Sequence, residues 1–119
     1  MRTMEDHENS KEVARQQFAK RLNELLDYYK VPAKQSGRQQ AVKAVLGVSQ
    51  EAVRKWAEGE AIPRHERIIT ICEVYPCRTA WLEYGELPMM EDRETMELLK
   101  LWDELSDAKR KALLETLRP

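Results

Sequence analysis

Residues 39–59 have the sequence QQAVKAVLGVSQEAVRKWAEG, and this stretch decides the fold that we predict. Apolar side chains follow helical spacing on both sides of a glycine: Val42, Val45 and Leu46 before it, then Val53 and Trp56 after it. Gly47 can adopt the left-handed conformation that ends a helix, and Val48 is then directed inward. The Ser49 hydroxyl can accept an amide hydrogen from the first turn of the next helix. The stretch therefore predicts two short helices joined by a tight turn.

The second helix of this pair is expected to have a polar face opposite Val53 and Trp56. That face consists of long, hydrogen-bonding side chains: Gln50, Glu51, Arg54 and Lys55. An α-helix fits the major groove of DNA, where each base pair presents a distinct set of donors and acceptors. The polar face is therefore suited to DNA recognition.

The segment 47–64, GVSQEAVRKWAEGEAIPR, resembles the helix-turn-helix of phage repressor, Cro and Xre-type transcription regulators. Residues 75–85, YPCRTAWLEYG, resemble the closing helix of lambdoid repressor amino-terminal domains, which end in a tryptophan, one or two leucines and a glycine. The resemblance extends over about residues 11–86 and implies a five-helix, lambda-repressor-like DNA-binding domain. One position departs from the family pattern, because Lys43 stands where the family usually has a small residue packed between the helices.

The resemblance also implies which side chains touch DNA. Base edges are expected to be contacted by Gln50, Glu51 and Lys55, while Arg54 serves bases or phosphates. In the major groove, glutamine pairs with adenine, lysine with guanine, and glutamate with the amino group of cytosine. Gln39 matches the family position that binds a backbone phosphate at a helix amino terminus. The other residues expected to contact phosphates are Arg38, Lys43, Ser49 and Arg64.

Charge is unevenly distributed along the chain, although the formal net charge is only −1. Residues 11–67 contain 12 Lys and Arg against 7 Asp and Glu, whereas residues 68–119 contain 7 against 11. The basic part thus coincides with the segment expected to face phosphates. The alternative interpretation is that these charges only solvate helix faces.

Helical spacing of apolar residues continues on both sides of the predicted helix pair, and no segment alternates convincingly as a strand would. A long first helix is expected from about residue 11 to residue 30, after a disordered tail over residues 1–10. A fourth helix over residues 64–75 and a short fifth helix over residues 79–84 complete the domain. The predicted fold class is all-α, with a DNA-binding domain over residues 11–86.

The segment after Pro88, residues 91–118, has more apolar surface than a lone exposed helix tolerates. Ser106 and Asp107 can cap a second helix in this segment, which predicts a helical hairpin. Such a hairpin either folds back on the domain or pairs with its copy in a second subunit, and the excess of leucine favours a homodimer. The residues expected in the dimer interface are Leu98, Leu101, Trp102, Leu105, Leu113, Leu114 and Leu117.

Length and composition limit the other functions. A chain of 119 residues is about one domain, without an apolar run for a membrane span, and its start, MRTMEDHENS, is unlike a signal peptide. We therefore expect a cytoplasmic protein of a bacterial or phage-infected cell. Cys72 and Cys77 are expected to be thiols packed as small apolar residues rather than a disulfide. A metal site with His7 and His65 is not expected, nor is a catalytic constellation, so we predict no cofactor and no enzymatic activity.

These observations predict a sequence-specific, double-stranded DNA-binding transcriptional regulator, most simply a repressor that binds a pseudo-palindromic operator as a dimer. One alternative is an antitoxin or a transcription activator that uses the same DNA-binding module and binds a protein partner through its carboxy-terminal helices. Another alternative is a protein-interaction adaptor, which acidic or apolar residues across the recognition face would favour.

Overall fold

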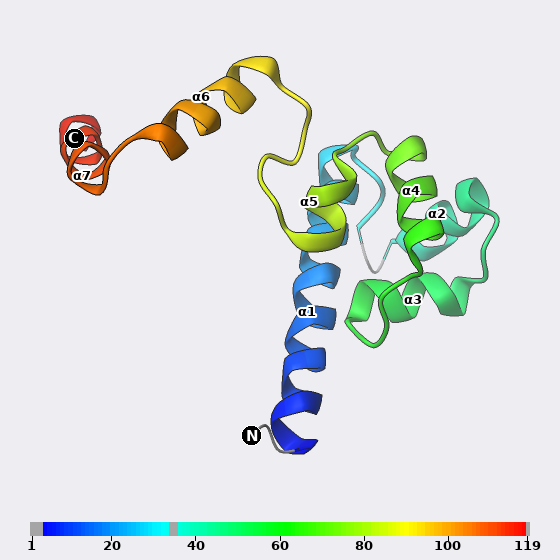
Figure 1. Cartoon of the computed structure of the whole chain (residues 1–119). Coiled ribbons are helices and arrows are strands. Elements are labelled where there is room, and N and C mark those ends of the chain that lie inside the picture. The colour runs from blue at the N-terminus through cyan, green and yellow to red at the C-terminus, as the bar shows by residue number, and fades with distance from the viewer. Residues whose placement is uncertain (1–3, 34–35, 119) are drawn as a thin grey trace.

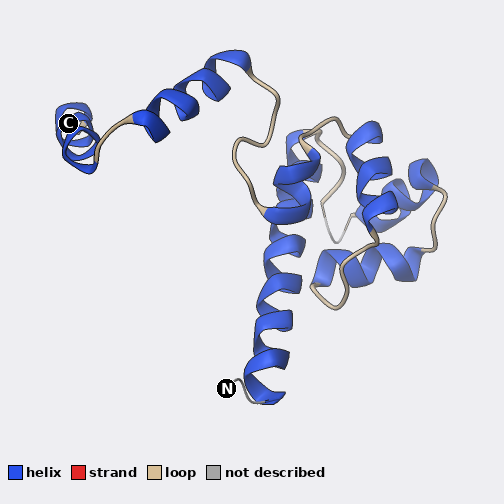
Figure 2. Cartoon of the chain, in the orientation of Figure 1, coloured by secondary structure: helices blue, strands red, loops and turns tan. Residues whose placement is uncertain are grey.

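A computed structural model describes residues 4–33 and 36–118. Within these residues the regular structure consists of seven helices and no strand (Figures 1 and 2). The helices are α1 (Met4–Tyr28), α2 (Arg38–Leu46), α3 (Gln50–Glu58), α4 (His65–Val74), α5 (Thr79–Tyr84), α6 (Arg93–Glu104) and α7 (Asp107–Leu117). The prediction of an all-α fold is confirmed.

The first five helices pack together as one domain around the carboxy-terminal half of α1. Helix α1 packs against α3 and α5, and α2 packs against α3 and α4. Each helix contributes large apolar side chains to one buried cluster: Phe18, Leu22, Leu25, Leu26, Val42, Val53, Trp56, Ile68, Ile71, Trp81 and Leu82. Burial of each such side chain contributes about 1.5–3 kcal/mol. The spacing of three and four residues in α1 places its share of this cluster on a single face of the helix.

Helix α1 begins earlier than the apolar spacing predicts. It starts at Met4, so the prediction of a disordered tail is wrong for residues 4–10, while residues 1–3 lie outside the described part of the chain. The amino-terminal half of α1 projects from the domain (Figure 1). Its sequence is rich in Glu, Lys, Arg and Gln, which are good helix formers, so the helix continues beyond the core that it packs against.

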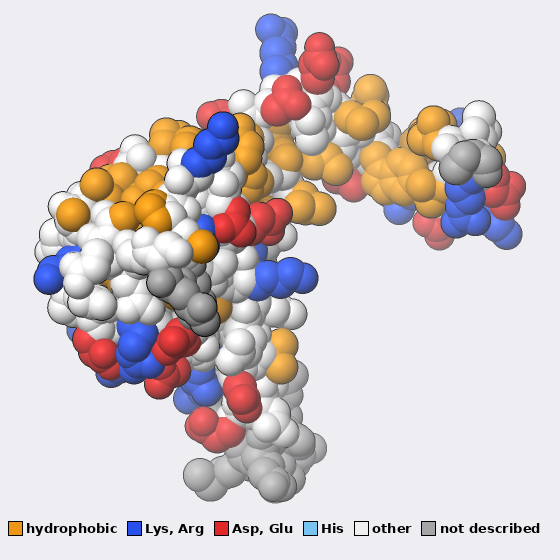
Figure 3. Space-filling view, turned by 180° about the vertical axis from the view of Figure 1, so that it is seen from behind, with side chains coloured by type: hydrophobic (Ala, Val, Ile, Leu, Met, Phe, Trp, Pro, Cys, Tyr) orange, Lys and Arg blue, Asp and Glu red, His pale blue; other side chains and the backbone are white. Residues whose placement is uncertain are grey.

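The carboxy-terminal helices α6 and α7 extend away from the domain (Figures 1 and 3). Both were predicted, and the Ser106 hydroxyl caps α7 as expected by accepting a hydrogen bond from the Lys109 amide at 3.3 Å. Only residues 105–106 connect the two helices, which form an open pair with a groove between them rather than a closed hairpin. The Arg110 guanidinium braces this pair, because it donates hydrogen bonds to the carbonyls of Trp102 and Asp103, both at 3.0 Å.

Hydrogen bonds from Arg78 and the packing of two methionines anchor the linker between α5 and α6. The Arg78 amide donates a hydrogen bond to the Met89 carbonyl at 2.8 Å, and its guanidinium donates to the carbonyls of Glu86 and Pro88. Met89 and Met90 pack against the core of the domain. The linker is therefore fixed as far as residue 90, and the projecting part of the chain begins after it.

None of the described helices combines the length and the apolar character needed to cross a membrane.

Candidate nucleic-acid interface

The turn between α2 and α3 has the geometry that the sequence predicts. Gly47 adopts a left-handed conformation with φ 67°, and its amide donates a hydrogen bond to the Lys43 carbonyl at 2.9 Å. The Ser49 hydroxyl accepts a hydrogen bond from the Ala52 amide at 3.1 Å, which caps α3. Val48 packs against the core between the two helices. A side chain at position 47 would be strained by the positive φ, so the glycine fixes where α2 ends.

Helix α3 presents two distinct faces. Val53, Trp56 and Ala57 are buried in the domain, whereas Gln50, Glu51 and Lys55 are exposed. The side-chain amide of Gln40, on α2, donates a hydrogen bond to the Gln50 side-chain oxygen at 2.8 Å. Because Gln40 holds the first residue of α3, it belongs to the candidate interface. The role of Gln40 was not predictable from the sequence, since apolar spacing carries no information about pairs of polar side chains.

Arg54 lies among three carboxylates. Its guanidinium donates hydrogen bonds to Glu51 at 2.7 and 3.0 Å and also pairs with Glu58 and Glu60. These hydrogen bonds raise the pKa of Arg54 above its already high ordinary value, and the Arg54 hydrogen bond lowers the pKa of Glu51. Arg54 and Glu51 therefore hold each other in the free protein, and a base contact by either requires that this pair rearranges.

The side chains predicted to contact phosphates are exposed or half-buried, with one exception. Lys43, Ser49 and Arg64 are exposed and Gln39 is half-buried. Lys43 and Lys55 make no ion pair with any residue in the described ranges, so both ammonium groups are available to a ligand. Lys43 lies on the exposed side of α2, so its long side chain does not have to fit between the two helices.

Arg38 is the exception, because its side chain is only 5% exposed. Its guanidinium donates hydrogen bonds to the carbonyls of Pro32 at 2.7 Å and Val31 at 3.0 Å, and to the Asn23 side chain at 3.3 Å. It also forms an ion pair with the Asp27 carboxylate. The prediction that Arg38 contacts a phosphate is wrong, since this side chain instead joins the end of α1 to the start of α2.

Comparison with known proteins agrees with this geometry. The family model described as Helix-turn-helix matches residues 33–82, from the loop before α2 into α5. The matched segment is similar to Xre-type helix-turn-helix domains. The match supports a DNA-binding regulator of transcription. Among curated proteins and solved structures, none matches the chain.

The residues predicted for dimerisation lie apart from the helix-turn-helix domain, on α6, α7 and the turn between them. Leu98, Leu101, Leu114 and Leu117 are exposed, and Trp102 and Leu105 are half-buried. Apolar side chains gather along this projecting arm in Figure 3. The groove between α6 and α7 has a volume of about 500 Å³, and its lining residues are Leu98, Leu101, Trp102, Glu104, Leu105 and Leu113. The structure thus brings most of the predicted dimerisation residues together around one groove.

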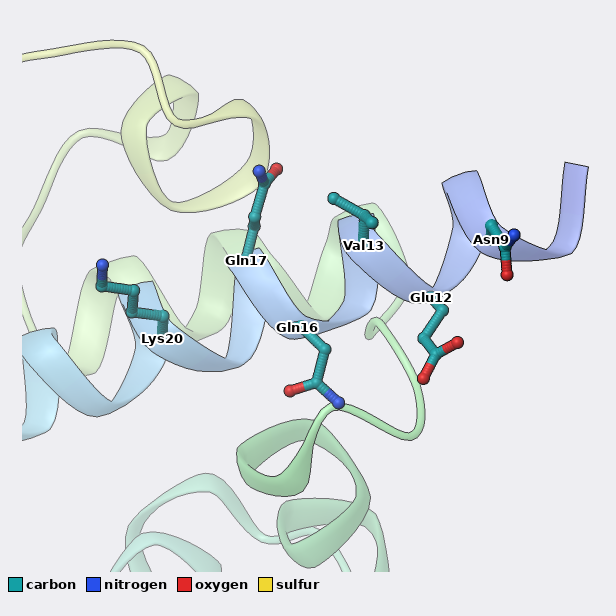
Figure 4. Close-up of a pocket in the computed structure, with 6 residues that line it drawn as sticks. All are labelled: Asn9, Glu12, Val13, Gln16, Gln17 and Lys20. Atoms are coloured by element: carbon teal, nitrogen blue, oxygen red, sulfur yellow. The ribbon is translucent and has the colours of Figure 1, made fainter. Parts of the chain in front are cut away.

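Another hollow runs along the exposed side of α1. Figure 4 shows its six lining side chains, and Gln16 among them points toward the loop that follows α3. All six residues come from one helix: Asn9, Glu12, Val13, Gln16, Gln17 and Lys20. This hollow lacks groups that converge from different elements, so we assign no ligand to it. Elsewhere in the described residues, no cluster of three or more His, Cys, Asp or Glu side chains is placed to hold a metal ion.

Proposed function

We propose that the protein is a sequence-specific repressor that binds operator DNA as a homodimer. The observation that most supports this proposal is the uncovered outer face of α3, where Gln50, Glu51 and Lys55 are exposed. Helices α6 and α7 extend from the opposite side of the domain and leave this face open (Figure 1). A helix presented in this way can enter the major groove with its first turn nearest the base edges.

Gln50 and Lys55 are the strongest candidates for base recognition. The hydrogen bond from Gln40 orients the Gln50 side chain, whose amide can donate to and accept from one adenine in the major groove. Lys55, without an ion pair in the described part of the chain, can donate to O6 and N7 of guanine. Glu51 can accept from the amino group of cytosine once Arg54 turns toward a base or phosphate.

Phosphate contacts are proposed on both sides of α3. The candidate residues are Gln39 and Lys43 on α2, Ser49 at the start of α3 and Arg64 before α4. Arg64 is the residue that precedes the first turn of α4, where the free amides and the helix dipole favour an anion. These contacts would position α3 along the groove without specifying sequence.

The proposed dimer forms through α6 and α7. Their exposed leucines leave an apolar surface that a monomer rarely presents, and Leu98 and Leu117 are 63% and 70% exposed. Helix α6 has four acidic and two basic side chains, while α7 has three basic and two acidic ones. Packing α6 of one subunit against α7 of the other would cover both apolar faces and match these opposite charges. Such a dimer would place two copies of α3 on successive half-sites.

A protein-interaction adaptor is the second candidate, and the surroundings of Arg54 favour it. Three carboxylates, from Glu51, Glu58 and Glu60, neutralise this arginine at the edge of the recognition face. An adaptor would use this mixed surface to bind a protein rather than DNA. A partner bound by the groove of α6 and α7, such as a toxin or a polymerase subunit, would instead fit an antitoxin or an activator.

Selection of binding sites from random duplex DNA tests the proposal. A dimeric repressor should enrich two half-sites related by a twofold axis and separated by about 34 Å, one helical turn. Placing the enriched site across a promoter should then reduce transcription in vitro. Lys20→Ala changes an exposed lysine on α1 and serves as a matched control, because the enriched sequence should not change. Failure to bind any duplex at low salt would favour the adaptor.

A further inference from the structure

Two thiols meet at the corner between α4 and α5, where the proposed function has no use for them. Cys72 lies on the buried side of α4, and Cys77 lies after the end of this helix, directly behind Pro76 in the sequence. The Cys77 thiol donates a hydrogen bond to the Cys72 sulfur, with 3.3 Å between the sulfur atoms. Both residues are free cysteines. The end of α4 thus turns the chain back and brings two thiols five residues apart into contact.

Both cysteines line a hollow at the surface of the domain. Cys72 is buried and Cys77 is half-buried. The hollow has a volume of about 450 Å³, and its other lining residues are Tyr28, Tyr29, Pro76, Arg78, Met90 and Glu91. The Tyr29 hydroxyl donates a hydrogen bond to the Pro76 carbonyl and so fixes one wall. A molecule of the size of a small peroxide fits this space and can reach the thiol pair.

The contact also makes one of the two sulfurs a better nucleophile. The hydrogen bond from Cys77 lowers the pKa of the Cys72 thiol to about 7, and a hydrogen bond with Thr79 acts in the same direction. Burial and the charge of Glu83 oppose this change but are outweighed. The same contact raises the pKa of Cys77, which therefore keeps its proton. The lowered pKa makes more of Cys72 thiolate at neutral pH than in an ordinary cysteine, and the thiolate is the form that attacks oxidants.

We propose that Cys72 and Cys77 form an oxidisable dithiol, which hydrogen peroxide converts into an intramolecular disulfide. The Cys72 thiolate attacks one peroxide oxygen, the O–O bond breaks, and the departing hydroxide takes up a proton to become water. This leaves Cys72 as a sulfenic acid. The Cys77 sulfur then attacks the Cys72 sulfur, and the sulfenic oxygen leaves as water with the Cys77 proton. Two thiols are oxidised, and one peroxide is reduced to two waters.

The position of the pair within the fold suits this reaction. A disulfide has an S–S distance of about 2.05 Å, so the sulfurs have to approach each other by roughly 1 Å. The next residue, Arg78, holds the linker to α6 through the carbonyls of Glu86, Pro88 and Met89. Oxidation would therefore tie α4 to the residue that precedes this anchor.

Mass spectrometry of the full chain tests the proposal directly. The reduced protein is treated with a small molar excess of hydrogen peroxide, denatured without reductant and alkylated with iodoacetamide. We expect no disulfide between two chains. The mass of each chain should fall by two hydrogens, and neither cysteine should take up an alkyl group. Both cysteines lie in the tryptic peptide 68–78, so this peptide should show the same loss. Dithiothreitol should restore two alkylation sites.

Two variants separate a reacting pair from two independent thiols. Cys77→Ser keeps the Cys72 sulfur but removes its partner, so peroxide should leave a sulfenic acid that dimedone traps. Cys72→Ser removes the thiolate, and peroxide consumption by the remaining thiol should be at least tenfold slower. The proposal is overturned if the wild-type chain keeps both thiols under conditions that oxidise a free thiol. It is also overturned if oxidation links different chains or ends in sulfinic acids without loss of two hydrogens.

Discussion

Replacing Arg38 with alanine should destabilise the domain strongly without removing a DNA contact. The guanidinium is buried, and the carbonyls of Pro32 and Val31 depend on it for hydrogen bonds. Pro32 is exposed and Val31 is half-buried, so the cost is that of losing hydrogen bonds from a charged donor, about 1.5–3 kcal/mol each. The Asp27 carboxylate is 70% exposed and can be hydrated again, so its share is below the roughly 3–5 kcal/mol of a fully buried ion pair. We expect a total loss of about 3 kcal/mol.

Thermal unfolding followed by circular dichroism measures this loss. For a domain of this size, about 1 kcal/mol corresponds to a change of roughly 4–8 °C, so Arg38→Ala should lower the Tm by about 15 °C. Arg38→Lys keeps the charge but lacks the planar fork that binds several acceptors, and its Tm should fall between those of the wild type and Arg38→Ala. Operator affinity measured well below the Tm should keep its dependence on salt concentration.

Arg64→Ala is the matched control for this experiment. Arg64 is exposed and its side chain makes no capping hydrogen bond to α4. Its removal should change the free energy of unfolding by less than about 0.5 kcal/mol. The structural role of Arg38 is refuted if Arg38→Ala unfolds at the wild-type temperature and binds DNA with a weaker dependence on salt. That result would return Arg38 to the phosphate contacts.

The proposed DNA contacts, the dimer and the thiol pair can each be tested by a single change. Gln50→Ala or Lys55→Ala should each cost about 1–3 kcal/mol of operator binding and relax the preference at one base pair, and an unchanged selection profile would contradict this. Lys43→Ala or Arg64→Ala should weaken binding to all duplexes and reduce the salt slope by about one unit, whereas a loss confined to one sequence would argue against phosphate contacts. Truncation after Met90, which keeps the methionines that pack against the core, should yield a folded monomer in sedimentation, and a dimer would refute the role of α6 and α7. Alkylation of Cys72 should become faster as the pH rises through about 7, because the thiol with its lowered pKa loses its proton there. A midpoint near the ordinary pKa of a thiol would contradict this prediction.

Features set by neighbouring residues were predictable from the sequence. Gly47 ends α2 and Ser49 caps α3 because backbone conformation and capping involve residues only a few positions apart. The buried residues of α3 were also predicted, since helical spacing places Val53 and Trp56 on one face. The same spacing wrongly placed Val45 on the buried face of α2, since this side chain is 54% exposed. Helical spacing shows which residues share a face, but not how much of that face a neighbouring element covers.

The partners of the charged side chains were decided only by the tertiary structure. Nothing in the sequence distinguishes Arg38 from Arg64, yet the fold buries Arg38 against Asp27 and leaves Arg64 exposed. Arg21 likewise donates a hydrogen bond to the Leu82 carbonyl, 61 positions away along the chain. Helix boundaries and faces depend on short-range geometry, and the sequence alone determined most of them here. Whether a long polar side chain binds a carbonyl of its own protein or is available to DNA depends on which distant elements pack beside it.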